Sequence, residues 1–270
     1  MRVIYIAGMS HSGSTLLNLM LNAHPAIFAV GELIDLNRVT RGSSYPPCPC
    51  GAPSLQECEF WSRVNDWTQQ EAGMPLSDLD VLNDCKLDQR CDPNALVFRA
   101  ISKVSGKKFI VDSSKRPARL AYLMQLKRLD IFPIHLIREP NGQICSLSRK
   151  NGGFVQHICD YVRIHERIHR IVRSVPHVVV YYEDLVRDPT GTLSSILEPL
   201  GLQFDQAQLS WAEQRQHTIA GNKLRWQPND LILDERWKES LTPTQQFIIG
   251  LGTAYSRRRL ASFSSQPHHA

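Results

Sequence analysis

Short apolar runs alternate along this chain with segments in which apolar residues recur at helical spacing. The runs are rich in β-branched and aromatic residues, as buried parallel strands are. They predict strands at residues 2–8, 26–32, 107–114, 132–139 and 177–185. The helical patterns predict helices at residues 14–24, 60–70, 94–106, 118–129, 141–152, 154–174 and 192–202. Strands that alternate with helices predict an α/β fold, with a central parallel sheet flanked by helices on both faces.

The length and composition favour one large domain. The chain has 270 residues, of which 42% are hydrophobic, and this is enough for a sizeable core. No internal repeat is visible. We expect a single domain over residues 1–262, with an irregular insertion that contains Cys and Pro at residues 35–95 and a flexible tail at residues 263–270.

The charge of the chain is mildly basic, with a net charge of +5 and no long run of Lys or Arg. This balance suits a small polyanionic ligand and falls short of a nucleic-acid footprint. No apolar stretch reaches the length of a membrane span, and the N-terminal one lacks a small-residue cleavage site. The seven cysteines, an odd number, argue against a disulfide framework and favour a cytoplasmic location.

Three of the cysteines, Cys48, Cys50 and Cys58, cluster within the insertion. They could bind zinc together with Cys85, Cys91 or a histidine, or two of them could form a disulfide. Their spacing is not C-x-x-C, however, so the pattern favours partly buried free thiols in a surface loop. We therefore expect no metal site.

The clearest motif is Gly-Met-Ser-His-Ser-Gly-Ser-Thr at residues 8–15, which follows a predicted strand and opens a predicted helix. It fits the phosphate-loop template G-x-x-x-x-G-K-[ST] except at Ser14, where the template has lysine. The amides of residues 11–15 can form an anion nest at the helix N-terminus. Because the lysine of the template bridges β- and γ-phosphates, its absence favours a 5′-phosphate with one further group. A phosphotransferase in which Asp112 binds magnesium is the alternative.

A second anion site is predicted after the strand at residues 132–139. Arg138 stands at the end of this strand, and Ser146 follows eight residues later in a predicted helix. An arginine at the carboxyl end of a strand can bind phosphate with two parallel hydrogen bonds. Two anion sites at one edge of the sheet suit a nucleotide with phosphates at the 5′ and 3′ positions.

These residues resemble the sulfotransferases that use 3′-phosphoadenosine 5′-phosphosulfate (PAPS). GMSHSGSTLLNLMLNAHP is similar to the 5′-phosphosulfate loop of the family, with a tail found in its bacterial and tyrosylprotein branches. IREPNGQICSLSRKNGG resembles the 3′-phosphate motif, and VVVYYEDLVRDPTGTLSSILEPLGL resembles a later strand and helix of the family. HTIAGNKLR is similar to a segment that helps to enclose the nucleotide. The motifs run in family order from residue 3 to about residue 226.

The resemblance implies a phosphate-loop architecture and a site for PAPS, which becomes adenosine 3′,5′-bisphosphate without the help of a metal. It assigns the cofactor site to Ser10, His11, Ser12, Gly13, Ser14, Thr15, Arg138, Ser146, Gly221, Asn222 and Arg225. The implied reaction moves a sulfuryl group to a hydroxyl, or an amine, of a small metabolite or carbohydrate. Residues 35–95 are then the expected acceptor region.

The resemblance also implies three catalytic residues. Glu32, which follows the second predicted strand, is the candidate base for the acceptor proton. Lys115 is expected to stabilise charge on the leaving phosphate, with Asp112 capping the next helix or orienting this lysine. His11 stands where many relatives have Lys or Arg, so it acts either as a cation or as a neutral donor.

The non-enzymatic alternative is a nucleotide-binding module that keeps both anion sites and has lost the chemistry. Glu32 and Lys115 argue against this module, as Ser14 argues against a phosphotransferase. The sequence therefore favours a PAPS-dependent sulfotransferase.

Overall fold

Five parallel strands in the described part of the chain form its central sheet. The computed structural model describes residues 1–41, 47–81, 92–226 and 231–264. The strands are β1 (Arg2–Gly8), β2 (Ile27–Ala29), β3 (Phe109–Lys115), β4 (Asp130–Ile137) and β5 (Val178–Tyr181). They lie in the order β2-β3-β1-β4-β5, and every neighbouring pair is parallel. The predicted fold class is confirmed.

Strand β1 lies at the centre of the sheet because both of its faces are apolar. Val3, Tyr5 and Ala7 belong to one buried core, whereas Ile4 and Ile6 belong to another. Successive side chains of a strand point to opposite faces, so one run of apolar residues serves both cores.

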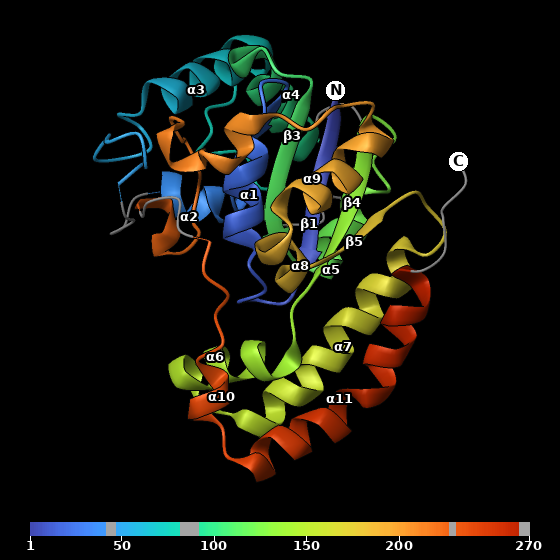
Figure 1. Cartoon of the computed structure of the whole chain (residues 1–270). Coiled ribbons are helices and arrows are strands. Elements are labelled where there is room, and N and C mark those ends of the chain that lie inside the picture. The colour runs from blue at the N-terminus through green and yellow to red at the C-terminus, as the bar shows by residue number, and fades with distance from the viewer. Residues whose placement is uncertain (42–46, 82–91, 227–230, 265–270) are drawn as a thin grey trace.

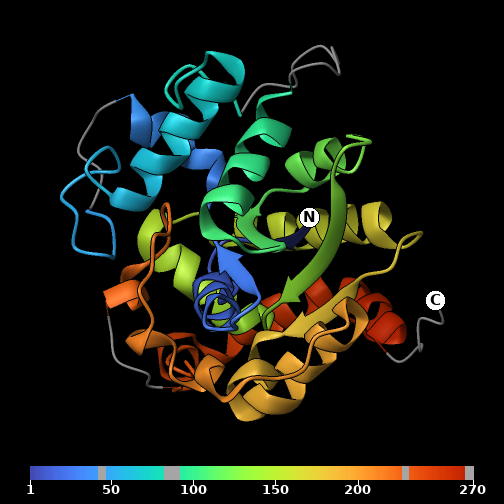
Figure 2. The ribbon, with the colours of Figure 1, turned by 90° about the horizontal axis from the view of Figure 1, so that it is seen from above.

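Helices cover the two faces of the sheet (Figure 2). On the side of Ile4 lie α1 (Ser14–Asn22), α8 (Tyr182–Arg187) and α9 (Pro189–Leu197). On the side of Val3 lie α4 (Pro93–Ser105), α5 (Pro117–Leu123) and α7 (Phe154–Val172), and α3 (Glu59–Ala72) packs outside α4. The short α2 (Leu36–Thr40) continues from β2 into the insertion.

Three helices, α4, α6 (Pro140–Asn151) and α9, begin with the same local signal, an acidic residue followed by proline. Asp92 accepts hydrogen bonds from the first amides of α4, Asp188 does so for α9, and Glu139 does so for α6. A carboxylate at this position satisfies amides that have no partner inside the helix, and proline suits the first turn.

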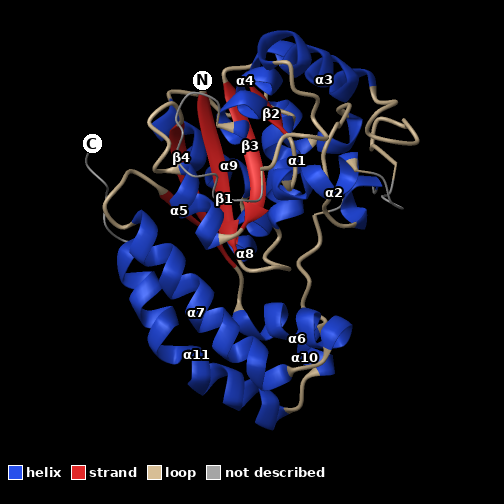
Figure 3. Ribbon diagram, turned by 180° about the vertical axis from the view of Figure 1, so that it is seen from behind, coloured by secondary structure: helices blue, strands red, loops and turns tan. Residues whose placement is uncertain are grey.

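A third core lies beyond the carboxyl ends of the strands. Helices α6, α7, α10 (Trp237–Ser240) and α11 (Pro243–Ser264) pack together there, as Figures 1 and 3 show. Met9, which follows β1 directly, is buried in this core. The edge of the sheet at which the motifs lie is therefore enclosed by helices from the second half of the chain.

The structure shortens several of the predicted elements: the strand predicted over residues 26–32 ends at Ala29, and the helix predicted over residues 192–202 ends at Leu197. The last predicted strand ends at Tyr181, and residues 182–185 belong to α8 instead. The helix predicted over residues 118–129 ends at Leu123. The predicted insertion contains α2 and α3, whereas residues 265–270 of the predicted tail lie outside the described residues.

Helix α11 was not predicted. Its apolar periodicity is interrupted by Gly250 and Gly252. The sequence nevertheless holds a start signal, because Thr242 and Gln245 form reciprocal hydrogen bonds between side chain and backbone amide, as in a capping box.

Among the helices in the described residues, none combines the length and the apolar character needed to cross a membrane.

Candidate active site

The loop between β1 and α1 leaves several hydrogen-bond donors without partners. Gly13 is the N-cap of α1 with a φ of +91°, and no side chain caps the first-turn amides. A side chain at residue 13 would meet the ring of Tyr182. The hydroxyl of Ser12 is buried and has no hydrogen-bond partner. Uncapped amides and an unpartnered hydroxyl at a helix N-terminus favour an anionic ligand, as the sequence predicted.

His11 connects this loop to helix α6. Its Nδ1 lies 2.8 Å from the hydroxyl oxygen of Ser146. The backbone of His11 has a φ of +65°, a left-handed conformation that non-glycine residues adopt mainly where the surroundings require it. The predicted loop and the predicted helical serine are thus brought together.

The surroundings of His11 favour the neutral form of its imidazole. Partial burial lowers its pKa below the ordinary value, and the positive charges of nearby side chains lower it further. These side chains are Lys150, Arg138, Lys115 and Arg149. Of the two roles left open by the sequence, the electrostatics favour the neutral donor.

Arg138 lies on the other side of His11. Its Nη1 donates to the His11 carbonyl at 3.0 Å, and the guanidinium lies over the Tyr182 ring at 4.7 Å from the centroid. The side chain is almost fully buried, with 7% of its surface exposed. Both residues predicted for the 3′ site, Arg138 and Ser146, therefore contact His11.

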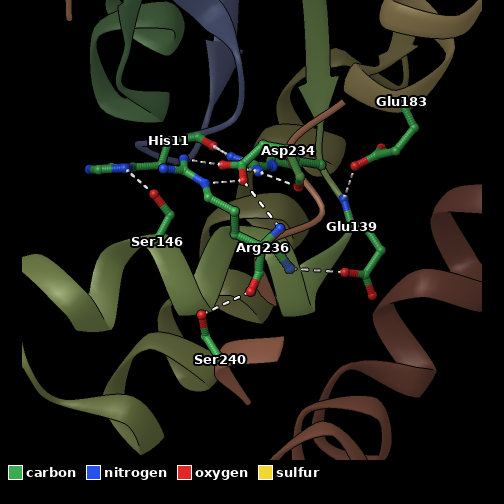
Figure 4. A network of polar contacts seen from close by, with 9 residues as sticks. His11, Glu139, Ser146, Glu183, Asp234, Arg236 and Ser240 are labelled. Carbon is green, nitrogen blue, oxygen red and sulfur yellow. Dashed lines mark hydrogen bonds and ion pairs between the residues drawn. The ribbon is translucent and has the colours of Figure 1, made fainter. Parts of the chain in front are cut away.

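An acidic residue that the sequence did not reveal engages Arg138. The Asp234 carboxylate accepts from Arg138 at 3.1 Å. It also accepts from Arg236 at 2.6 Å, as Figure 4 shows. The hydrogen bond from Arg236, followed by that from Arg138, holds the pKa of Asp234 well below its usual range. Two guanidinium groups that converge on one carboxylate can also hold a phosphate.

Glu32 and Lys115 form an ion pair on the opposite side of the loop, with 2.5 Å between Oε1 and Nζ. Lys115 is the last residue of β3 and has a φ of +67°, and Glu32 follows β2. Both side chains are mostly buried. Asp112 neither caps the next helix nor orients Lys115: its carboxylate pairs with Arg119 at 3.1 Å and accepts from the Ser114 amide.

The order of the strands sets the order of these groups. The strand sequence β2-β3-β1-β4 places Glu32, Lys115, the loop and Arg138 side by side at the carboxyl edge. Ligands of open α/β sheets bind at this edge, where the chain reverses its direction of winding. A carboxylate–ammonium pair thus lies on one side of the loop between β1 and α1 and a buried arginine on the other.

The sequence profile of the sulfotransferase family matches residues 3–206 of this chain. The chain belongs to the sulfotransferase family. The predicted family is confirmed, and with it the prediction of an enzyme. No match was found among curated proteins.

Solved sulfotransferase structures share the fold. The sulfotransferase domain of the Synechococcus PCC 7002 olefin synthase has a TM-score of 0.63 at 22% identity, over 94% of each chain. The sulfotransferase domain from the curacin biosynthetic pathway has a TM-score of 0.62 at 19% identity, over 94% of this chain and 97% of its own. Mouse sulfotransferase SULT7A1 complexed with PAP has a TM-score of 0.51 at 10% identity, over 95% and 85%.

A late segment of this sulfotransferase folds back over the loop. Ile219 forms a parallel bridge with Gly31, and the Asn222 amide lies 3.4 Å from the Thr15 hydroxyl. Gly221 has a φ of +105° and lies against Thr15 and Arg225. The predicted Gly221, Asn222 and Arg225 therefore lie at the start of α1, beside the predicted loop.

Two further residues of the candidate site were not found from the sequence. Gln143 donates from its amide to the Ser10 carbonyl at 2.9 Å, and so ties α6 to the loop. The other is Arg236, which shares Asp234 with Arg138. Gln143 lies within the segment that resembles the 3′-phosphate motif, but its contact with Ser10, 133 residues away, could not be read from that segment. Arg236 stands in no recognised motif and reaches Arg138 through its neighbour Asp234.

The residues present fit a nucleotide with two separate anionic groups. The loop offers the uncapped amides of α1 and the unpartnered Ser12 hydroxyl for one group. Arg138, Arg236 and Ser146 offer donors for the other. The phosphate-loop lysine, which a triphosphate would use, is replaced by the buried Ser14.

The clustered cysteines of this sulfotransferase also come together. Cys48, Cys50 and Cys58 gather around His217, so a histidine rather than a cysteine completes the group in the described residues. Cys85 and Cys91, the other predicted partners, lie outside those residues.

Proposed function

We propose that this sulfotransferase moves the sulfuryl group of PAPS to a hydroxyl group of a small molecule or carbohydrate. The observation that carries the proposal is the order of groups at the sheet edge. The Glu32–Lys115 pair lies on one side of a loop without the phosphate-loop lysine, and Arg138 lies on the other. The PAP bound to a structural neighbour supports the same class of donor.

The chain offers different residues for the two ends of the donor. The amides of residues 11–15 and the Ser12 hydroxyl would hold the 5′-phosphosulfate at the positive end of α1. Arg138, together with Ser146, would hold the 3′-phosphate, with the Asp234 carboxylate giving way to the ligand. The bridge between Gly31 and Ile219 would keep the enclosing segment in place.

PAPS, when bound, supplies a sulfuryl group linked to its 5′-phosphate through a bridging oxygen. Glu32 would accept the proton of the acceptor hydroxyl as the new oxygen–sulfur bond forms. Lys115 would stabilise the negative charge that the 5′-phosphate gains as its bond to sulfur breaks. The ion pair between the two residues keeps both groups in place before the acceptor arrives.

Arg138→Ala is expected to remove most of the preference for a 3′-phosphate. The charge-assisted contact that is lost is worth roughly 1.5–3 kcal/mol, or about a 10- to 150-fold change in affinity. Calorimetry with adenosine 3′,5′-bisphosphate and with AMP measures this preference as the ratio of the two affinities. The AMP affinity should change little, because AMP does not use this site.

The matched control for this experiment is Arg63→Ala, which removes an exposed arginine from α3. The control should keep the wild-type ratio of affinities. Equal binding of AMP and the bisphosphate by the wild type would contradict the two-site arrangement. Tighter binding of ATP with magnesium would support a phosphotransferase instead.

His11 should act without a positive charge. Because its folded-state pKa lies below the ordinary value of about 6.5, the imidazole is neutral at pH 7 and above. Activity should therefore not fall as the pH rises from 6.5 to 8, and His11→Gln should keep turnover within about tenfold, since an amide can also donate a hydrogen bond. A pH–rate profile of both proteins checks this. A wild-type rate that falls over this range and becomes flat in His11→Arg would show that the cation is required.

The lowered pKa of His11 should also appear in the pH dependence of the free energy of unfolding. Below pH 6.5, the unfolded chain protonates His11 more readily than the folded chain does, so this residue lowers the free energy of unfolding as the pH falls. His11→Gln should reduce this acid-side loss, as measured by urea denaturation at pH 5 and pH 7. An unchanged difference would mean that burial does not hold the imidazole neutral.

A screen of acceptors with radiolabelled PAPS, followed by mass spectrometry for an added sulfuryl group, tests the proposal as a whole. Labelled product from a hydroxyl acceptor supports it. Tight binding of the bisphosphate without transfer to any acceptor would favour a nucleotide-binding module that has lost the chemistry.

A further inference from the structure

Three thiols and one imidazole converge beside the edge strand β2, apart from the phosphate loop. Sγ of Cys58 lies 3.7 Å from Sγ of Cys48, 3.7 Å from Sγ of Cys50 and 3.1 Å from Nδ1 of His217. All four atoms lie within 4.8 Å of one another. Cys48 and Cys58 are buried, and the other two residues are partly buried. The group joins segments of the chain that are 159 residues apart.

The spacing of the sulfur atoms suits one tetrahedral ion. Zinc–sulfur bonds of about 2.3 Å in tetrahedral directions put two sulfur ligands about 3.8 Å apart. The two Cys58 distances, each 3.7 Å, agree with this edge of a tetrahedron. A nitrogen ligand at about 2.0 Å from zinc would lie about 3.5 Å from each sulfur, a few tenths of an ångström further than the imidazole now lies from Cys58. A small outward shift of the His217 ring would complete the site.

The local backbone supports thiolate ligands. The amide of Cys50 is directed at the sulfur of Cys48, and the amide of Trp61 at the sulfur of Cys58. Amides that donate to sulfur stabilise the deprotonated form, which is the form that binds metals.

The loop that carries the thiols is held in a closed turn. The Gly51 amide donates to the Cys48 carbonyl, the Cys48 amide donates to the Ala52 carbonyl, and Gly51 has a φ of +97°. The loop then runs to Cys58, the N-cap of α3. Residues 47–58 contain neither helix nor strand, so a metal would supply the stability that regular structure does not.

The histidine is held in position by its own neighbours. The ring of His217 stacks on Phe60 with 5.2 Å between centroids, and the His217 carbonyl accepts from the Trp61 indole at 2.8 Å. These contacts fix the orientation of the ring toward the thiols before any ion binds. A preformed set of three sulfurs and one nitrogen is the ligand set of a closed structural zinc site, with no open position for catalysis.

We propose that Cys48, Cys50, Cys58 and His217 hold a structural zinc ion. A disulfide between two of the cysteines would use neither the third thiol nor the imidazole. Free thiols would leave a polar group gathered from two distant segments with only weak hydrogen bonds between its members. One tetrahedral ion uses all four groups.

The position of the ion suggests what it stabilises, and this step rests on the proposed function. Two residues beyond His217, Ile219 accepts from the Glu32 amide at 2.8 Å and donates to the Val30 carbonyl at 2.7 Å. Gly221, which lies beside the phosphate loop, follows two residues later. The zinc would therefore anchor the segment that positions both the proposed base and the proposed nucleotide site.

The metal content of the full-length chain tests the site directly. The protein is produced without a polyhistidine tag, and zinc is counted by plasma mass spectrometry. We expect close to one zinc per chain, released in step with the modification of thiols by a mercurial reagent. Replacement by Co²⁺ should give the visible absorption and the sulfur-to-metal charge-transfer band of a tetrahedral thiolate site.

Four variants locate the ion. Cys58→Ser and His217→Ala should lower zinc affinity by at least about 100-fold, because even the loss of a residue that only supports a ligand costs 10- to 100-fold. His217→Cys should keep the zinc, since it restores a fourth ligand. Cys159→Ser, which removes an exposed thiol on α7, is the matched control and should also keep it.

Two results would overturn the site: a Cys48–Cys58 disulfide in a chain that takes up no zinc after anaerobic reduction and incubation with zinc, or full zinc retention in Cys58→Ser. A failure of the proposed function is seen separately, as a zinc-loaded chain that does not bind adenosine 3′,5′-bisphosphate. If the zinc is present but its removal by chelation leaves the affinity for adenosine 3′,5′-bisphosphate unchanged, the site stands and the anchoring role falls.

Discussion

Glu32→Gln is expected to lower turnover by about 100- to 10,000-fold, the usual contribution of a general base. The glutamine side chain has nearly the same shape but cannot accept the proton of the acceptor. The affinity for adenosine 3′,5′-bisphosphate should stay within about twofold, because Glu32 is proposed to contact the acceptor and not the nucleotide. Steady-state rates and calorimetry on the same preparation measure the two effects.

Asp35→Asn is the matched control for Glu32→Gln. It removes a carboxylate three residues further along the same segment, where Asp35 pairs only with the exposed Arg38 among the contacts described here. Its turnover should remain close to that of the wild type. Wild-type turnover in Glu32→Gln would refute the role of this residue as the base.

Lys115→Met is expected to lower turnover by about 100- to 1,000-fold, the range found when a group that stabilises transition-state charge is removed. It should also weaken the binding of the bisphosphate, because Lys115 interacts with charge that is present before the reaction. Lys115→Arg should restore part of the rate. Lys103→Met, which removes an exposed lysine from α4, should behave as the wild type does.

Because the two catalytic candidates are in contact, a double variant of Glu32 and Lys115 tests whether they act together. Because Glu32 and Lys115 touch at 2.5 Å, their effects should not add. The double variant should lose less than the product of the two single losses, as groups that act together do. Strict additivity would mean that the two residues work at separate steps. An unimpaired Lys115→Met would leave the charge on the leaving phosphate to another residue.

The strands and the order of the motifs could be predicted because their signals are local. The run at residues 2–8 is apolar on both faces, and only a buried parallel strand needs that pattern. The phosphate loop and Arg138 could be placed at one edge because both follow strands, and parallel strands end at the same edge. Glu32 and Lys115 also follow predicted strands, but the strand order that makes them neighbours came from the structure.

Contacts between distant segments could not be predicted. Nothing in the sequence near Arg138 indicates that Asp234 reaches it across 96 residues. The sequence around His217 likewise does not indicate that it lies near the cysteines, because a single histidine 159 residues from Cys58 forms no metal-ligand spacing with it. Asp112 was assigned to its neighbours in sequence, whereas burial made it pair with Arg119, a cation on the following helix.

Local signals also failed where two structures compete for the same residues. Tyr181 and Tyr182 continue the β-rich pattern of β5, yet α8 begins at Tyr182. The Tyr182 ring is needed beside Gly13 and beneath Arg138, and these contacts outweigh the strand propensity of the residue.

The central position of β1 has a consequence for the synthesis of the chain. Arg2 pairs with Phe109 on one side and with Asp130 on the other, so β1 leaves the ribosome well before both of its neighbouring strands have been made. At about 5–20 residues per second, the two apolar faces and unpaired edges of β1 stay exposed for roughly 6 to 25 seconds until both neighbours have been made. Closing such long loops is slow and leaves apolar strands open to other chains. We therefore expect the nascent chain to depend on chaperones until about residue 140 has emerged, long before the sulfotransferase site can form.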